Sequence, residues 1–281
     1  MTIANTRMGV QKQVYATHPS EMAALSTPEL RDRFVLEDLF APGEVRWVLT
    51  HHDRILIGGA MPGGGTIELE APHEIRAAAF CDRREIGILC LSGSGVVVAD
   101  GEELALDTED IAYVGQGTAS VSVGGDAVFY MISAPAHLKH PTRVGRRGDV
   151  ETMEVGDRDK ASFRTIRKYI LPGGIDSCEI AMGVTTLEPG NVWNTMPCHI
   201  HDRRTEVYLY FDLPEDERVV HLCGEPQSTR SLVLANRQAV ISPPWSIHTG
   251  AGTAPYKFVW STAGENLAWD DMDPVATHTL K

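Results

Sequence analysis

Residues 194–211 read NTMPCHIHDRRTEVYLYF and carry the strongest indication of fold and function in the chain. Side chains alternate between the two faces of a β-strand, so His199 and His201 point to the same side and their imidazoles can approach one ion. Glu206 has the wrong parity to join them on a continuous strand. The letters DRRT must therefore turn the chain, so that CHIH ends one strand and EVYLYF opens the next.

A third imidazole is offered by His248, which follows a Pro-Pro turn in SPPWSIHTG. Three nitrogen ligands and the carboxylate of Glu206 suit zinc, and nearly as well Fe, Mn, Ni or Co. The ordinary alternative is a solvated polar turn, which is what most isolated HxH pairs are. The residues alone leave both interpretations open.

Elsewhere the chain consists of short apolar runs separated by Gly, Pro, Asp and Asn. Many short strands at such spacing predict an all-β antiparallel sandwich or barrel. A few short helices are expected as well. HPSEMAAL favours a single turn, and STPELRDRFVLEDLF favours a helix with Thr27 as the N-cap and Pro28 in the first helical position.

An internal sequence repeat indicates that the β domain is duplicated. FCDRREIGIL, residues 80–89, resembles IHDRRTEVYL, residues 200–209. A Met-Pro pair precedes each string and a Gly-Glu turn follows it. Three matches in the same order predict two β domains, residues 1–145 and residues 146–281.

The two halves differ at the candidate ligands. Aligned on DRR, the positions of His199 and His201 are Ala79 and Cys81 in the first half. The sequence therefore predicts a metal site in the second half only. The first half keeps the fold and is expected to serve packing or assembly.

Composition limits the classes of partner. The chain has 281 residues and a net charge of −13, which disfavours nucleic acid and anionic membranes as partners but allows a small anionic substrate at a local cationic cluster. No apolar run is long enough to span a bilayer, and the first residues lack the apolar core of a secretory signal. The five cysteines are widely spaced, with no CxxC, as in a reducing compartment. We therefore expect a cytoplasmic protein.

The spacing HxH, four residues, Glu and a histidine about 40 residues later resembles the metal-binding pattern of the cupin superfamily. The chain departs from that pattern in reading PPWSIH where PxGxxH is usual, and in lacking a glycine five residues before the first histidine. Longer strings, PGNVWNTMPCHIHDRRTEVYLYF, QAVISPPWSIHTGAGT and FVWSTAGENLAWDDMD, resemble the family of 4-deoxy-L-threo-5-hexosulose-uronate ketol-isomerases. That resemblance covers nearly the whole chain.

The resemblance implies duplicated cupin jelly-roll barrels, a bicupin, with one zinc ion per subunit in the C-terminal barrel and assembly as a homo-oligomer, a hexamer. Carried over residue by residue, the implied ligands are His199, His201, Glu206 and His248, the four that spacing proposes. Other divalent ions remain compatible with this ligand set.

The implied reaction is an aldose–ketose isomerisation in pectin or related uronate degradation. A 5-keto-4-deoxyuronate becomes 3-deoxy-D-glycero-2,5-hexodiulosonate when a proton moves between neighbouring carbons through a metal-stabilised ene-diolate. A base must carry that proton. The candidates for it are Glu206, Glu265 and Tyr208.

The substrate carboxylate calls for a cation, since a guanidinium binds a carboxylate through two hydrogen bonds. The candidates are Arg203, Arg204, Arg164 and Lys168, with Met196 as a possible cover of the metal. Each of the charged residues has the ordinary alternative of a solvated charge or a salt bridge to one of the 38 acids.

Three alternatives share much of this pattern. A related bicupin, 5-deoxyglucuronate isomerase of inositol breakdown, acts on a similar sugar acid. An iron-dependent cupin dioxygenase would use the same four ligands with iron and oxygen. A non-catalytic sugar-binding bicupin is the third, and the intact ligand set argues against it.

Overall fold

The computed structural model describes residues 9–281, which divide into two compact units. Of the described residues, unit 1 contains 9–13, Leu39–Gly148 and Ile175–Cys178, and unit 2 contains Val14–Asp38, Asp149–Gly174 and Glu179–Lys281. The sequence-based division at residue 145 assigns residues 14–38 to the first half. The structure groups them with unit 2.

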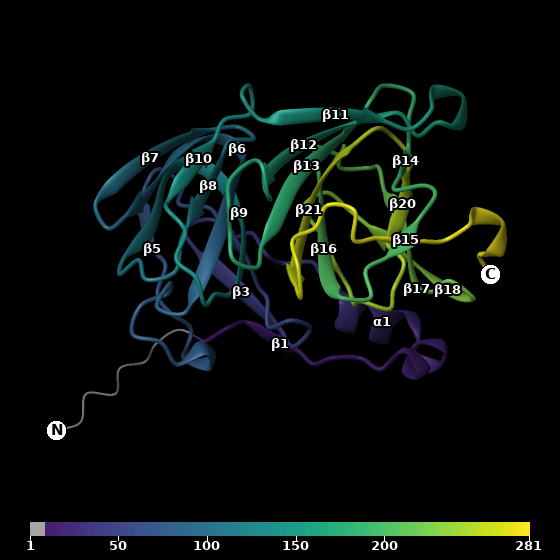
Figure 1. The fold of residues 1–281 in the computed structure, drawn as a ribbon, viewed down its shortest axis with the longest axis horizontal. Coiled ribbons are helices and arrows are strands. Elements are labelled where there is room, and N and C mark those ends of the chain that lie inside the picture. Colours follow the sequence, from purple (N-terminus) through teal and green to yellow (C-terminus); the bar gives the residue numbers. More distant parts are fainter. Residues whose placement is uncertain (1–8) are drawn as a thin grey trace. The chain divides into compact units, whose positions relative to one another are not determined.

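Unit 1 is built on one antiparallel sheet in the order β1-β3-β4-β9-β6-β8-β10, with β5 on β9 and β7 on β6 (Figure 1). The strands are β1 Lys12–Val14, β3 Val45–Thr50, β4 Leu56–Ala60, β5 Thr66–Glu68, β6 Arg84–Ala99, β7 Glu102–Asp107, β8 Ile111–Val114, β9 Val121–Pro135 and β10 Arg143–Gly145. A 3-10 helix, η2, spans His73–Ile75.

The long strands β6 and β9 fold this sheet onto itself. Their register shifts between Cys90 and Ser92, and such a bulge bends a strand. The first half of β6 pairs with β8, and the second half pairs with β7. The two halves therefore form facing layers, and a buried apolar cluster that includes Trp47, Phe80 and Phe129 forms their core.

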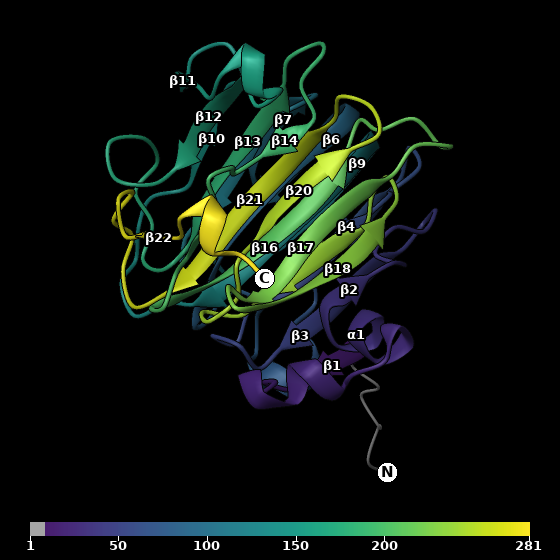
Figure 2. The same cartoon turned by 90° about the vertical axis from the view of Figure 1, so that its right-hand side faces the viewer.

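Unit 2 holds a seven-stranded sheet in the order β11-β12-β13-β21-β16-β19-β2 and a four-stranded sheet in the order β14-β20-β17-β18 (Figures 1 and 2). The first consists of β11 Glu151–Val155, β12 Arg164–Ile170, β13 Ala181–Leu187, β21 Lys257–Gly264, β16 Arg204–Phe211, β19 Ala239–Ser242 and β2 Val35–Leu36. The second consists of β14 Trp193–Asn194, β20 Thr249–Gly252, β17 Val219–Glu225 and β18 Ser228–Leu234. A short pair, β15 His199–Ile200 and β22 Asp273–Pro274, and the 3-10 helices η1 Pro19–Ala24, η3 Arg158–Lys160 and η4 Thr277–Thr279 complete the unit.

The segment before β2 forms the helix α1, Thr27–Phe34, and packs on unit 2. Its apolar residues Leu30 and Phe34 join the core of that unit, and Val35 then pairs with Val240 of β19. The expected N-cap was wrong by one residue. Ser26 is the N-cap, because the Glu29 carboxylate accepts its backbone N–H at 2.7 Å and so closes a capping box.

The expected turn between CHIH and EVYLYF is present, with one difference. The chain turns after His201, but β16 already begins at Arg204, two residues before Glu206. Residues 199–200 pair with β22 and belong to neither large sheet. The all-β prediction with a few short helices is confirmed, and none of the helices in residues 9–281 is long and apolar enough to cross a membrane.

Candidate metal centre

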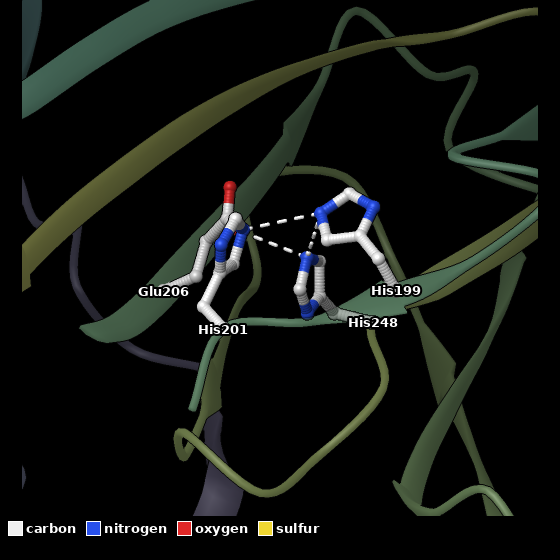
Figure 3. A group of neighbouring side chains, drawn as sticks. All are labelled: His199, His201, Glu206 and His248. Carbon is white, nitrogen blue, oxygen red and sulfur yellow. Dashed lines mark hydrogen bonds and ion pairs between the residues drawn. The ribbon is translucent and has the colours of Figure 1, made fainter. Parts of the chain in front are cut away.

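Four side chains of unit 2 converge from three places in the chain (Figure 3). His199 lies on β15 and His201 directly after it, Glu206 lies on β16, and His248 immediately precedes β20. The Nε2 atom of His199 is 3.1 Å from Nε2 of His201 and 3.1 Å from Nε2 of His248. Glu206 Oε2 is 2.8 Å and 2.9 Å from the same atoms of His201 and His248.

These side chains fit a divalent metal. His201 donates from Nδ1 to the Asp271 carbonyl at 2.7 Å, which turns its Nε2 lone pair inward. Glu206 Oε2 is buried and has no hydrogen bond to any described residue. A carboxylate oxygen and several nitrogen lone pairs that face one another are mutually repulsive unless a cation lies between them. Imidazole nitrogens and a carboxylate oxygen are donor types that zinc and related divalent ions accept, so these four residues would hold such an ion.

The protonation states agree with this arrangement. Burial, together with the neighbouring imidazoles of His248 and His201, lowers the pKa of His199 to about 2, so this ring is neutral at physiological pH. Burial alone would raise the pKa of Glu206, but the two adjacent imidazoles outweigh it and hold that pKa well below its ordinary value. A neutral His199 ring and an ionised Glu206 carboxylate are the ligand forms that a divalent ion requires.

Three of the four residues, His199, His201 and Glu206, form part of the wall of a cavity of about 300 Å³ within unit 2. The wall is largely apolar and includes Trp260, Leu267 and Trp269. A Cβ atom added to Gly183 would overlap the indole of Trp260, so glycine is required for the ring to lie in the wall. The cavity therefore combines a polar end, at the ligand cluster, with an apolar remainder.

Tyr208 lines the cavity and lies two residues after Glu206 on β16. Its hydroxyl shares a 3.0 Å hydrogen bond with Thr195, and its ring packs edge-on against His248, with centroids 5.4 Å apart. Burial and the Glu206 carboxylate raise the pKa of Tyr208 well above its ordinary value. The phenol therefore stays protonated and can donate a hydrogen bond.

The two arginines of the DRRT turn are engaged elsewhere. Arg204 lines the cavity but donates to the carbonyls of Ala268 and Asp271, at 3.0 and 2.9 Å. Arg203 does not line it and pairs with the carboxylates of Asp271 and Asp273. Both arginines tie the segment of residues 266–273 to the ligand-bearing strand.

The structure separates the other two candidate cations. Arg164 lines the cavity and donates to the Ser162 carbonyl at 2.8 Å, and burial lowers its pKa. Lys168 lies outside the cavity wall, where it pairs with Glu151 at 2.9 Å and sits over the ring of Trp269.

Glu265 and Met196 also lie outside the cavity wall. Glu265 is exposed just after β21, and Met196 accepts a contact from the Thr277 hydroxyl through its sulfur. The structure adds three contributors that the residue pattern did not single out: the Asp271 carbonyl behind His201, Thr195 beside Tyr208, and Thr262 in the wall. Thr195 lies within the quoted motif, whereas Thr262 becomes visible only through strand pairing.

Comparison with known proteins identifies relatives over nearly the full length. The model of the KduI/IolB family matches residues 35–279. A protein of Kineococcus radiotolerans named 4-deoxy-L-threo-5-hexosulose-uronate ketol-isomerase is 49% identical over 278 residues, covering 96% of this chain and 100% of the relative. A protein of the same name from Caldicellulosiruptor bescii is 47% identical and covers 95% of this chain and 99% of the relative.

Solved structures share the fold at low sequence identity. An IolB-like protein of Salmonella typhimurium superposes with a TM-score of 0.68 at 15% identity, over 84% of this chain and 94% of the other. An oxalate decarboxylase of Lactobacillus farciminis superposes with a TM-score of 0.60 at 9% identity, over 84% and 87%. The duplicated cupin fold expected from the sequence is confirmed.

Proposed function

The chain belongs to the KduI/IolB family, and we propose that it is a 4-deoxy-L-threo-5-hexosulose-uronate ketol-isomerase. The reaction converts the open-chain 5-keto-4-deoxyuronate into 3-deoxy-D-glycero-2,5-hexodiulosonate. The observation that carries the proposal is the convergence of three imidazoles and one carboxylate beside a cavity, in a chain with relatives of this name.

We propose zinc as the ion held by His199, His201, Glu206 and His248. When bound, it would supply Lewis-acid stabilisation for the negative charge that develops on the two oxygens of the reacting aldehyde–alcohol pair. The isomerisation needs no redox change, so an ion without redox chemistry is sufficient.

The proton moves from the carbon that bears the alcohol to the aldehyde carbon. Glu206 is the one carboxylate among the candidate bases that lies in the cavity wall, so we assign to it the removal and return of that proton. Tyr208, which stays protonated, donates a hydrogen bond to a substrate oxygen. Glu265 is exposed outside the wall, and we give it no role.

Arg164 is the cavity cation to which we assign the substrate carboxylate. Both arginines of the wall carry charge, but the donors of Arg204 are directed at the carbonyls of residues 268 and 271. The guanidinium of Arg164 keeps donors for a planar carboxylate after its bond to Ser162. Arg203, Lys168 and Met196 lie outside the cavity wall, and we assign no substrate contact to them.

The first experiment follows the reaction itself. The zinc-loaded protein is incubated with the 5-keto-4-deoxyuronate in deuterated water, and NMR records loss of the aldehyde, gain of the ketone and entry of deuterium at the former aldehyde carbon. Absence of turnover with metal bound would refute the assignment. Parallel samples with 5-deoxyglucuronate, and measurement of oxygen uptake with the iron-loaded protein, test the two alternative enzymes.

A second experiment tests the metal ligands. We expect His248→Ala to lose the metal while the fold survives, because the apolar core of unit 2 is untouched. Elemental analysis and circular dichroism measure the two properties. His278→Ala, an exposed histidine that belongs to no group of possible metal ligands, is the control and should retain the metal. Full metal content in the His248 variant would remove that residue from the ligand set.

Several finer assignments rest on family resemblance. We propose that residues 146–281 carry the metal barrel and residues 1–145 a barrel without ligands. We also propose a cytoplasmic location, a role in pectin or related uronate degradation, and a homo-hexamer. Light scattering coupled to size-exclusion chromatography measures the last of these.

A further inference from the structure

Thr262 occupies the position on β21 directly opposite Glu206 of β16. Side chains of directly paired residues point to the same face of an antiparallel sheet, with Cβ atoms roughly 5 Å apart. On its other side Thr262 pairs with Ala181 of β13, whose small side chain leaves space toward the cavity. All three residues line the cavity wall.

The hydroxyl of Thr262 is buried and has no hydrogen-bond partner among the described residues. Only 4% of the residue is exposed. Burying a hydroxyl without a partner is unfavourable, so such a group in a cavity wall points to a ligand that completes it. The neighbouring hydroxyls of Thr195 and Tyr208 differ, because they bond to each other at 3.0 Å.

We propose that the Thr262 hydroxyl hydrogen-bonds one of the two reacting oxygens of the substrate, at the ligand-cluster end of the cavity. This inference rests on the proposed isomerase function. A hydroxyl can donate one hydrogen bond and accept two, so it suits an oxygen that passes between carbonyl, alcohol and enolate character. Its donated bond strengthens as negative charge develops on that oxygen, and the residue therefore acts on the rate of the chemical step.

The β-branch of Thr262 also fixes the direction of the hydroxyl. The backbone of Thr262 lies between two paired strands, and a branched side chain in a strand has restricted rotation about its first bond. The donor is therefore held in place before the substrate arrives.

Thr262→Val removes the hydroxyl and keeps the shape of the side chain. We expect kcat to fall roughly 10- to 100-fold, with KM changing by less than about threefold, because the bond is strongest in the transition state. Thr262→Ser should stay within about fivefold of the wild-type kcat, since it keeps the donor and loses only the restriction by the methyl group.

Ser261 supplies the matched control. It is the next residue on β21, points to the opposite face, is 1% exposed, and its hydroxyl also lacks a partner among the described residues. Ser261→Ala should therefore leave kcat within about twofold of wild type. Metal content should equal that of wild type in every variant, and the melting temperature should not fall in Thr262→Val or Ser261→Ala, because no described group bonds to either hydroxyl.

Several outcomes would overturn the inference: a wild-type kcat in Thr262→Val, an equal loss in Thr262→Ser, an equal loss in Ser261→Ala, or loss of metal from Thr262→Val. The last would mean that Thr262 supports the ligand cluster and not the substrate. If the wild-type protein itself does not turn over, all variants will be equally inactive, and the proposed function fails together with this inference.

Discussion

Strands β6 and β16 each begin with an arginine, Arg84 and Arg204, but the side chains that follow it contribute to different kinds of interior. Glu206 on β16 pairs with Ser242 and Thr262, and the matching position on β6 is Ile86, which pairs with Val114 and Ser133. Ile86 is fully buried in the apolar cluster of unit 1. The same strand frame thus supports a hydrocarbon core in one unit and a cluster of imidazoles with a carboxylate in the other.

The comparison also separates frame residues from site residues. Arg84 of β6 donates to the carbonyls of Arg54 and Ser133, and Arg204 of β16 donates to those of Ala268 and Asp271. Arg84 makes these bonds in a unit that lacks counterparts of His199 and His201. The property that the two arginines share is therefore to donate to backbone carbonyls at the start of the strand, which does not depend on the ligand cluster. The side chains of four site residues are not kept in unit 1, where Ala79, Cys81, Ile86 and Ile88 stand at the positions of His199, His201, Glu206 and Tyr208.

The largest effect on activity is expected when the residue of β6 is placed at the matching position of β16. Glu206→Ile should abolish metal binding and lower kcat/KM by at least roughly 10³-fold, because the charge stabilisation of several kcal/mol is lost. The metal-free variant should still fold, because the matching strand of unit 1 packs an isoleucine at this position. Metal analysis and urea unfolding measure both properties.

The reciprocal change, Ile86→Glu, is its control. It buries an unpaired carboxylate in the apolar core of unit 1 and should lower the free energy of unfolding by about 3–5 kcal/mol. Hydrogen exchange should be accelerated in β6 and β9. Unchanged protection there would contradict the view that unit 1 uses this position for apolar packing.

Tyr208→Phe tests the second difference between the strands. Loss of the protonated donor should lower kcat roughly 10²-fold, with metal content unchanged. Ile88→Leu, at the matching position of β6, should leave kcat unaffected. Retention of full activity by the phenylalanine variant would remove Tyr208 from the mechanism.

Paired substitution of the arginines tests the property that they share. Arg84→Met and Arg204→Met should each cost about 2 kcal/mol of stability, since each leaves backbone carbonyls without charged donors. Only Arg204→Met should also weaken metal affinity, by roughly 10- to 100-fold, because the Asp271 carbonyl that it holds orients His201. Calorimetric titration with zinc distinguishes the two variants. Equal metal affinity in Arg204→Met and wild type would show that the carbonyl is held without the arginine.

A smaller effect is expected from acid. Burial lowers the pKa of His199 to about 2 and that of His221 to about 3, whereas both rings titrate near 6.5 when unfolded. Between these values the unfolded chain binds more protons, so the stability of metal-free unit 2 should fall as pH decreases below about 6.5. The slope is up to about 1.4 kcal/mol per pH unit for each histidine.

Hydrogen exchange at pH 7 and pH 5 should therefore show greater loss of protection in β16 and β17 than in β6 and β9. Unit 1 contributes in the same direction through the buried His52, whose pKa is also lowered by burial. His221→Gln should reduce the pH dependence of β17. An unchanged pH profile in that variant would exclude His221 as its source.

Local rules of strand geometry predicted the frame of the site. Alternation placed His199 and His201 together, and the parity of Glu206 required a turn that the structure contains. Ion pairing could not be predicted in this way, because the partners of Arg203 at residues 271 and 273 are distant in sequence.

The register between paired strands was the second feature that the sequence could not predict. Thr262 faces Glu206 only because β21 pairs with β16 in one register, which hydrophobic patterning does not specify over such a separation. The helix cap was missed by one residue for a different reason. Ser26 and Thr27 are both good capping residues, and the reach of Glu29 decides between them.

The grouping of residues 14–38 with unit 2 has a consequence for synthesis on the ribosome. The helix α1 and strand β2 are translated before Leu39–Gly148, yet β19, which pairs with β2, is completed some two hundred residues later. Unit 1 can complete most of its sheet during that interval, because domains fold as units as they emerge. Unit 2 therefore closes last, around a segment that was translated before Leu39–Gly148.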